Sequence, residues 1–522
     1  MSTFILGLIV VAYLLLTAFL GFLGYRKTTS SSDYLVGGRS MNPIVMALSY
    51  GAAFISASAI VGFGGVSAAF GMGIQWLCFL NMFIGVVIAF IFFGLRTRRL
   101  GAELNVGTFP QLLGRYYRSR TIQIFVAAVI FLGMPLYAAV VMKGGAVFIE
   151  QIFRIDFNIA LLIFTLVVAA YVIAGGMKAV MYTDAMQAVI MFLCMLFLLF
   201  WFYKVIGMGF TEANEKLTEM APLVPGKFRE LGHQGWTRMP VTGSPQWFTL
   251  VTSLIMGVGL GCLAQPQLVV RFMTVKSSKQ LNRGVFIGCL FILITVGAIY
   301  HIGALSNIFF LQTEGAVATE VVNDIDKIIP YFITKSMSEW FSAIFMLCIL
   351  SASMSTLSSQ FHTMGTSAGS DIYGTYKPHS GRLTNVIRTG IFFAILVSYM
   401  ICYMLPNDII ARGTAMFMGV CASSFLPAYF CALYWERATR QGALASLWTG
   451  ALASVFALVF LHEKEAAAIG VCKALFGKNV LIESYPFPMI DPIMFALPLS
   501  IAAMVVVSLL TKGKSEVKRL HR

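Results

Sequence analysis

The chain has 522 residues, of which 58% are hydrophobic and only 11% are charged, and its formal net charge is +15. Soluble domains carry about 25% charged residues, so this composition excludes a soluble globular protein and indicates a chain that crosses a membrane many times. The 9 cysteines lie singly without a C-x-x-C pair, which favours small buried side chains over a metal or disulfide role.

Runs of about 20 apolar residues predict membrane-spanning helices. No basic residue precedes the first run, and Arg26 and Lys27 follow it, which argues against a cleaved signal peptide and predicts a first helix with its N-terminus outside. The thirteen predicted spans are residues 3–24, 43–70, 73–95, 121–150, 157–175, 180–206, 246–270, 284–309, 338–370, 385–404, 408–434, 441–461 and 488–511.

The basic residues support this orientation. With thirteen spans and the N-terminus outside, most Lys and Arg fall in cytoplasmic segments, among them 96–120, 271–283 and the tail 512–522. This is the positive-inside pattern of membrane proteins, so the positive charge requires no nucleic-acid partner. We expect an integral protein of the plasma (inner) membrane, held in the lipid bilayer, with a cytoplasmic C-terminus.

Two predicted spans are interrupted by small residues or proline. The span 43–70 contains four glycines and two central serines, Ser56 and Ser58, and the span 246–270 contains three glycines followed by Pro266. Interrupted helices at corresponding places of two halves are typical of the binding site of a secondary transporter. The alternative is that the glycines only allow close packing between helices.

The positions of these spans indicate an internal repeat. Spans two to six and seven to eleven form two units of five helices, and an odd number of helices inserts the second unit upside-down. We therefore predict an all-α polytopic membrane protein with a five-plus-five inverted repeat. Its single transporter domain divides into a leading helix, the first repeat, the second repeat and two trailing helices, at 3–24, 43–206, 246–434 and 441–511.

The predicted span 338–370 carries many hydroxyl groups without a formal charge. One face, at spacings of three and four, holds Ala352, Ser355, Thr356, Ser359 and Thr363. Neutral oxygens suit a hard cation such as Na⁺ and still release it, and transition metals prefer other donors. Ser355 and Thr356, with carbonyls of an unwound second span, would form an oxygen cage. The alternative is that the hydroxyls bond to their own helix or a neighbour.

Asp184 is the clearest carboxylate inside an apolar run, near the start of the predicted span 180–206. An ionisable group in a membrane segment is a functional candidate, here for passing a cation toward the cytoplasm. The alternative is an anion that stabilises the first turn of a helix. The candidate residues for the wall of a solute cavity are Ser56, Ser58, Gln75, Trp76, Tyr137, Cys262 and Gln265.

No cluster of metal ligands and no nucleophile–base pair appears in the sequence, so an enzyme is not predicted. Five segments spread over almost the whole chain form a far more specific combination. They read YLVGGRSMNPIVMALSYGAAFISASAIVG (34–62), YVIAGGMKAVMYTDAMQ (171–187), AQPQLVVRFMTVKSSKQLNRG (264–284), ASMSTLSSQ (352–360) and LYWERATRQGALAS (433–446). On these segments the chain resembles the sodium:solute symporter family, most of all its sodium/pantothenate symporters and next its sodium/proline symporters.

The resemblance implies a LeuT-type fold and uptake of a small solute driven by Na⁺ as coupling ion. It implies that Asp184 matches the carboxylate on the sodium exit path, and Ser359 continues the hydroxyl face in that direction. The sodium site that it implies combines backbone oxygens of Ala52, Ile55 and Ala352 with the hydroxyls of Ser355 and Thr356.

The transported solute is less sharply indicated. Proline symporters carry a tryptophan and a tyrosine where this chain has Val258 and Cys262, and sugar-transporting members use polar residues where it has Ala59 and Ile60. The resemblance favours an anionic solute, a monocarboxylate or a pantothenate-like acid, that uses the positive end of a half-helix. A proline-like amino-acid symporter and a transporter-like membrane sensor are the alternatives.

Overall fold

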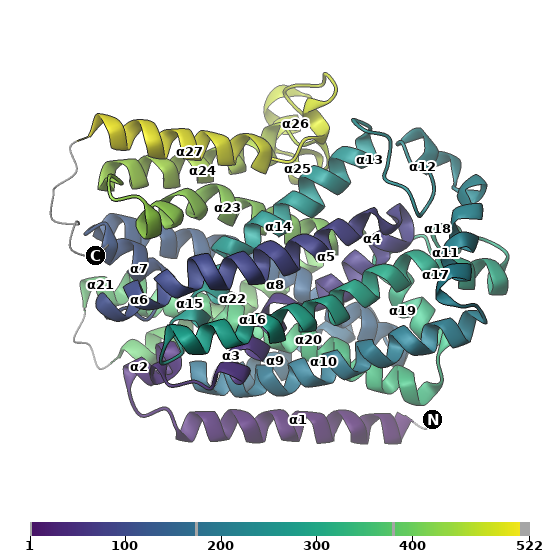
Figure 1. Cartoon of the computed structure of the whole chain (residues 1–522), viewed down its shortest axis with the longest axis horizontal. Helices are drawn as coiled ribbons and strands as arrows, with labels where there is room; N and C mark the ends of the chain where they lie inside the picture. Colours follow the sequence, from purple (N-terminus) through teal and green to yellow (C-terminus); the bar gives the residue numbers. More distant parts are fainter. Residues whose placement is uncertain (1–2, 173–175, 378–381, 512–522) are drawn as a thin grey trace.

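The computed structural model describes residues 3–172, 176–377 and 382–511, and its regular elements over these residues are helices (Figure 1). Most helices run along the long axis of the molecule, with α1 along one edge and α24 and α27 along the opposite edge (Figure 1). The predicted all-α architecture is therefore confirmed.

Eleven helices of the described chain are long and apolar enough to cross a membrane, and one bent pair forms a twelfth span. A shorter apolar helix covers Phe157–Ala170. Helices thus occur at all the predicted apolar runs. Because the helix Phe157–Ala170 is shorter than the other spans, the total of thirteen spans stays a prediction.

The helices that build the spans are α1 (Thr3–Arg26), α3 (Pro43–Phe54), η2 (Ser58–Gly62), α4 (Phe63–Phe70), α5 (Gln75–Met82), η4 (Phe83–Gly94), α6 (Leu95–Glu103), α8 (Arg120–Phe153), α9 (Phe157–Val172), α10 (Met177–Ile206), η6 (Thr249–Gly257), α14 (Val258–Gly261), η7 (Cys262–Ala264), α15 (Pro266–Phe272), α16 (Ser278–Ile292), η8 (Leu293–Gly297), α17 (Ala298–Glu314), α20 (Glu339–Thr366), η9 (Ser367–Tyr373), α22 (Leu383–Met404), α23 (Ile410–Tyr434), α24 (Arg440–Phe460) and α27 (Ile493–Leu510). The longer connecting helices are α7 (Phe109–Tyr116), α11 (Phe210–Glu219) and α19 (Ile325–Ser336).

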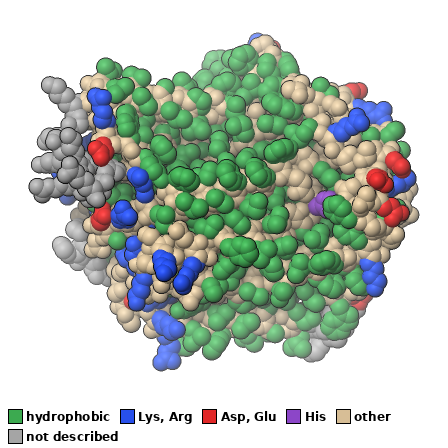
Figure 2. Space-filling view, viewed as in Figure 1, with side chains coloured by type: hydrophobic (Ala, Val, Ile, Leu, Met, Phe, Trp, Pro, Cys, Tyr) green, Lys and Arg blue, Asp and Glu red, His purple; other side chains and the backbone are tan. Residues whose placement is uncertain are grey.

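The surface of the molecule matches a protein embedded in a bilayer. Figure 2 shows apolar side chains covering the middle of one face, with Lys and Arg dominating its left end and both signs of charge at its right end. Burial increases toward the hydroxyl-rich helix: 89% of the most apolar window of Glu339–Tyr376 is buried, against 17% for α1. The centre of the bundle is therefore the helix that carries the hydroxyl run.

Both predicted interruptions are confirmed. The helix α3 ends at Phe54, Ile55 is extended with φ −89° and ψ 108°, and the next helical segment turns away by 55°. In the second case Gln265 is extended with φ −69° and ψ 115°, and Pro266 begins α15. Proline has no N–H to continue the preceding helix, so it fits the first position of the next one.

The glycines that drew attention to these spans do not lie at the breaks. They lie within the helical segments and against neighbouring helices. A Cβ at Gly65 would be 2.1 Å from the Ile325 carbonyl oxygen of α19, and one at Gly261 would be 2.6 Å from the Met418 Cβ of α23. Close packing therefore explains these glycines, while the chain is broken at other residues.

Candidate functional site

The two adjacent hydroxyls of α20 face the broken end of α3. Ser355 Oγ donates to the Ala52 carbonyl oxygen at 2.8 Å and lies 3.2 Å from the carbonyl oxygen of Ala352. Thr356 Oγ1 lies 3.3 Å from the Ala53 carbonyl oxygen and 3.5 Å from that of Ala52. All five residues are fully buried. Hydroxyl and carbonyl oxygens from two helices therefore converge at one buried position.

The break in α3 supplies these carbonyls. The last four carbonyls of a helix have no N–H of a following turn to accept from, and α3 ends at Phe54. Ile55 lies directly at the break, where its N–H donates to the Gly51 carbonyl at 2.8 Å. The oxygens of Ala52 and Ala53 are thus left for partners on α20 or for a cation.

The chemistry of this donor set fits a hard monovalent cation. Its oxygens are neutral and carry no thiolate or imidazole, which transition metals prefer. Across the described residues there is also no group of three or more His, Cys, Asp or Glu side chains that would hold a metal ion. Hydroxyl groups can rotate, so the oxygens that now share hydrogen bonds can turn their lone pairs to a bound ion.

Asp184 lies at the centre of a second buried cluster. Its Oδ2 is 2.7 Å from Arg271 Nη2 and accepts from Ser49 Oγ at 2.8 Å, and its Oδ1 is 3.4 Å from Ser358 Oγ. Arg271 also donates to Ser359 Oγ at 2.5 Å and to Ser49 Oγ at 2.9 Å. The cluster joins α3, α10, α15 and α20 through a buried charge pair. Both members of the pair also contact serine hydroxyls of α3 and α20.

Two sequence-based interpretations need correction here. Arg271 was assigned to a cytoplasmic segment because the predicted span ended at residue 270, but its side chain is only 1% exposed and lies on α15. The first-turn interpretation of Asp184 also fails, because α10 begins at Met177, about two turns earlier. The available signal for Arg271 was Pro266: a helix starting there carries Arg271 in its second turn, facing the bundle.

One helical turn joins the two clusters. Ser359 Oγ accepts from Arg271 and donates to the Ser355 carbonyl oxygen at 2.8 Å, and Thr363 Oγ1 donates to the Ser359 carbonyl at 2.8 Å. Ser358, Ser359 and Thr363 each donate a hydrogen bond to a carbonyl of their own helix, as the alternative interpretation of the hydroxyls expected. Ser355 and Thr356 differ because their hydroxyls reach backbone carbonyls at the broken end of α3.

Several candidate solute residues gather around the two breaks. The hydroxyls of Ser56 and Tyr137 are adjacent, and the Tyr137 ring packs on Phe417 with centroids 5.8 Å apart. The Gln265 side chain lies beside Cys421. The buried atoms Ser58 Oγ and Gln265 Nε2 have no hydrogen-bond partner among the described residues, which is the state expected of groups that line a hydrated or ligand-binding space.

Of the remaining solute candidates, Trp76 and Gln75 lie away from the breaks and Cys262 lies at the second one. Trp76 is 57% exposed and packs edge-on against Phe79, so it belongs to the outer surface, where a membrane-belt aromatic would lie. Gln75 Nε2 is 3.3 Å from the Gly297 carbonyl oxygen of η8. Cys262 is buried at the second break, with its thiol 3.1 Å from the Gly259 carbonyl oxygen. The structure therefore groups Cys262 with Gln265 but does not bring Trp76 to them.

Comparison with known proteins gives a consistent result. The model of the sodium:solute symporter family matches residues 34–450. The chain is 28% identical to the high-affinity proline transporter PutP of Bacillus subtilis over 83% of this chain and 88% of the relative. It is also 28% identical to the sodium/pantothenate symporter of Haemophilus influenzae over 85% of this chain and 89% of the relative. In fold it resembles a Na⁺-coupled sialic acid symporter, with a TM-score of 0.74, 15% identity and coverage of 98% and 99% of the two chains.

Proposed function

Because the chain belongs to the sodium:solute symporter family, we propose that it imports a small organic acid together with Na⁺ by alternating access. Members of this family are membrane transporters and not enzymes, so the protein is an integral membrane transporter with Na⁺ as its coupling ion. The identity of the solute, the ligands of the ion and the orientation in the membrane are the parts proposed below.

The contact between the α20 hydroxyls and the end of α3 carries the assignment of the sodium site. The ligands are the hydroxyls of Ser355 and Thr356 with backbone oxygens of Ala52, Ile55 and Ala352, and the nearby Ala53 carbonyl is a further donor. Binding Na⁺ there replaces hydroxyl–carbonyl hydrogen bonds by ion–oxygen contacts that join α3 to α20. The ion thereby holds the broken end of α3 in one arrangement.

This arrangement explains coupling to the solute. Ser56 follows Ile55 directly, and its hydroxyl lies beside that of Tyr137 on α8. An ion that orders residues 52–55 also orders the residue that begins the proposed solute site. Each ligand then favours the conformation that binds the other, which is the reciprocal coupling that symport requires.

The Asp184 cluster supplies the exit path. Ser359 lies one turn after Ser355 on α20, and Asp184 Oδ1 is 3.4 Å from Ser358 Oγ of the same turn, but Arg271 bonds to both Ser359 and Asp184. Sodium and the guanidinium group therefore compete for the same carboxylate. We assign Arg271 as the group that closes this path until α15 moves away from α10.

A carboxylate on the solute fits the first break. The continuous helical segment 58–70 starts at the break, so the positive end of its dipole points to the centre of the bundle, where Ser58 Oγ has no partner among the described residues. The relatives' names include proline and pantothenate, and both compounds carry a carboxylate. Val258 and Cys262 stand where proline symporters carry an aromatic pair, so the lining expected for proline is missing, and we assign a pantothenate-like acid or a short monocarboxylate as the solute.

The proposed topology has the N-terminus outside and the C-terminus in the cytoplasm of a plasma (inner) membrane. Its support is the charge asymmetry: the end of the bundle at the left of Figure 2 is dominated by Lys and Arg, as cytoplasmic ends are. The repeats remain 43–206 and 246–434, with the leading helix 3–24 before them and the trailing helices 441–511 after them. Each of these repeats contains one of the two broken helices.

Uptake by proteoliposomes tests the proposal. A panel of radiolabelled pantothenate, short monocarboxylates and proline is offered under an inward Na⁺ gradient alone and under an inward H⁺ gradient alone. We expect Na⁺-driven accumulation of one or more of the acids and none of proline. Uptake that follows only the proton gradient would exclude the sodium site, and Na⁺-driven uptake of proline alone would exclude the proposed solute class.

A further inference from the structure

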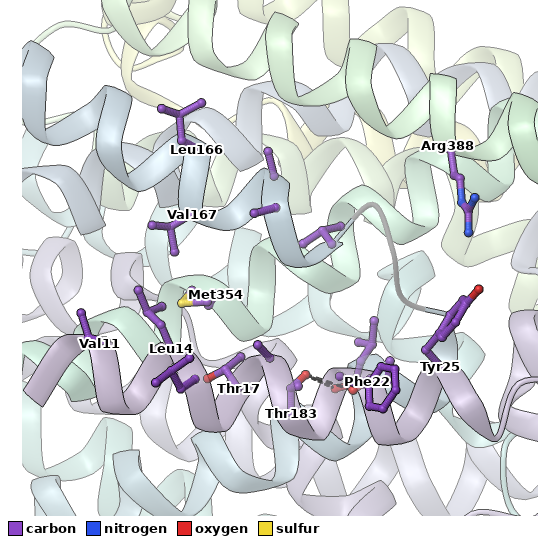
Figure 3. A pocket seen from close by; sticks show the side chains of 18 residues that line it. Val11, Leu14, Thr17, Phe22, Tyr25, Leu166, Val167, Thr183, Met354 and Arg388 are labelled. Atoms are coloured by element: carbon purple, nitrogen blue, oxygen red, sulfur yellow. Dashed lines mark hydrogen bonds between the residues drawn. The ribbon is translucent and has the colours of Figure 1, made fainter.

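A groove of about 1080 Å³ lies between α1 and α9, away from the proposed sodium site. Its wall is almost wholly apolar, with side chains such as Leu14 and Phe22 from α1 and Leu166 from α9 (Figure 3). The floor includes Met354 of α20 and Thr183 of α10. Since α1 is the least buried spanning helix of the described chain, the groove lies at the contact between the bundle and its most peripheral helix.

The dimensions of the groove fit one leaflet of a bilayer. Along α1 it extends from Val11 to Tyr25, which lie about 21 Å apart at the helical rise of 1.5 Å per residue. Half of a hydrocarbon core of about 30 Å is roughly 15 Å, and a headgroup region adds to that. A single acyl chain with its headgroup therefore spans the groove from end to end.

One end of the groove is charged. Arg388 of α22 points into it on the side of Tyr25 (Figure 3). Its Nε is buried and has no hydrogen-bond partner among the residues that the structure describes. Leaving a guanidinium nitrogen without a partner at the edge of a membrane is costly, and the planar group binds phosphate through paired hydrogen bonds.

The other charges at this end are already engaged or point elsewhere. Lys178 pairs with Asp33 at 2.5 Å, Arg26 lies over the ring of Phe22, and Lys27 lies over that of Tyr182. Arg26 and Lys27 directly follow Tyr25, so they add positive charge at the end of the groove where Arg388 lies. Basic pockets between spanning helices on the cytoplasmic side bind the headgroups of anionic lipids.

We propose that this groove is a binding site for one anionic phospholipid, with the phosphate on Arg388 and an acyl chain between α1 and α9. The acyl chain of the lipid contacts Thr183 and Met354, which are the immediate sequence neighbours of Asp184 and Ser355. The lipid therefore packs on the rear of the two helices that carry the proposed sodium route and fills the contact between them and α1.

Native mass spectrometry of the full chain tests the charged end. The protein is extracted from bilayers of phosphatidylglycerol and phosphatidylcholine, and retained lipids are counted for the wild type, Arg388→Gln and the control Arg99→Gln. Arg99 is an exposed arginine on α6 that does not line the groove. We expect one phosphatidylglycerol retained by the wild type and by Arg99→Gln, and at least a fivefold lower retention by Arg388→Gln. Equal retention by all three proteins, or of both lipids, would overturn the proposal.

Filling the groove tests its apolar part without touching the charge. A Cβ at Gly21 or at Gly7 would meet no atom within 4 Å, so both glycines of α1 accept a larger side chain, but only Gly21 lines the groove. Gly21→Phe is expected to lose the lipid and Gly7→Phe to keep it. Retention by both variants would show that the acyl chain does not occupy this space and would contradict the site.

A final arm separates a phospholipid from a free phosphate. Glycerol phosphate carries the same anionic group without acyl chains, and it is added in millimolar excess to the wild-type complex. The proposal expects the retained lipid to stay bound and the melting temperature to rise only with phosphatidylglycerol. Displacement or equal stabilisation by glycerol phosphate would show that an anion site exists without a lipid site.

Discussion

Arg271 and Asp184 form an ion pair of 2.7 Å across 87 residues of sequence, and neither side chain is more than 1% exposed. Asp184 lies in the first proposed repeat and Arg271 in the second. A buried pair gains little net stability over apolar residues, because both charges lose their hydration. The ion pair instead holds the two proposed repeats together beside the hydroxyl face of α20.

Removing one member of this ion pair should destabilise the folded protein more than removing both members. Arg271→Gln leaves the Asp184 carboxylate buried without a counter-charge, which typically costs about 3–5 kcal/mol. The double variant Arg271→Gln, Asp184→Asn leaves neutral amides and is expected to recover most of that stability while sodium-coupled transport stays impaired. Thermal unfolding in detergent and sodium efflux from proteoliposomes measure the two effects.

The pair between Lys327 and Glu150 provides the control. Its atoms are 3.1 Å apart, but its side chains are 33% and 22% exposed. Solvent-screened pairs contribute about 0–1 kcal/mol, so Lys327→Gln should change the melting temperature little. Equal destabilisation by Lys327→Gln and Arg271→Gln, or a double variant as unstable as the single one, would contradict the proposed role of the buried pair.

The solute site should be separable from the sodium site. Tyr137→Phe and Ser58→Ala each remove one hydroxyl near the break, which we expect to raise the KM for the transported acid about tenfold, as for the loss of one hydrogen bond to a charged group. Sodium half-saturation should change less than twofold. Initial uptake rates at varied solute and varied Na⁺ give both constants, and a change confined to the sodium constant would move these residues out of the solute site.

A pH dependence should arise on the proposed outer side, where α19 meets the start of α23. Asp326 Oδ2 accepts from the N–H groups of Ile409 and Ile410 at 3.1 and 3.3 Å, and Asp408 Oδ1 accepts from the Ile325 N–H at 2.6 Å. Burial raises the pKa of Asp326 to about 7; the nearby carboxylates of Asp324 and Asp408 add to this rise, and Lys143 opposes it.

The sign of this effect is fixed by the direction of the shift. The folded protein holds a proton on Asp326 that the unfolded chain releases near pH 3.8, so its stability contribution is complete below about pH 4 and is lost as the pH rises through about 7. Asp326→Asn keeps an acceptor oxygen without the charge and should raise the melting temperature at pH 8 by about 2–4 °C, with no gain at pH 4. An identical pH profile for wild type and variant would refute this assignment.

The sequence was most informative where a physical pattern is local. Hydroxyl spacing alone singled out Ser355 and Thr356, and an apolar texture with small residues located both broken spans. It placed the breaks less well, because glycine serves packing as well as bending: the chain leaves the helix at Ile55 and Gln265, and the glycines contact other helices.

Residues that act through distant contacts were harder to predict. Arg271 looked like a basic loop residue because nothing in its local sequence reveals a carboxylate that approaches it from 87 residues away. Trp76 was chosen by residue type, but the side of a helix that faces the bundle depends on packing, and the structure turns it outward. Both cases required the tertiary arrangement.

The most direct test is binding of radiolabelled Na⁺ to the purified protein in the absence of solute. The wild type is compared with the double variant that carries both Ser355→Ala and Thr356→Ala, and with the control variant Ser398→Ala. The buried hydroxyl of Ser398 bonds to the Ala394 carbonyl of its own helix at 2.7 Å. The account predicts at least a tenfold weaker sodium affinity in the double variant and an unchanged affinity in the Ser398 control. Unchanged sodium affinity in a folded double variant would contradict the assignment of Ser355 and Thr356 as ligands of the coupling ion.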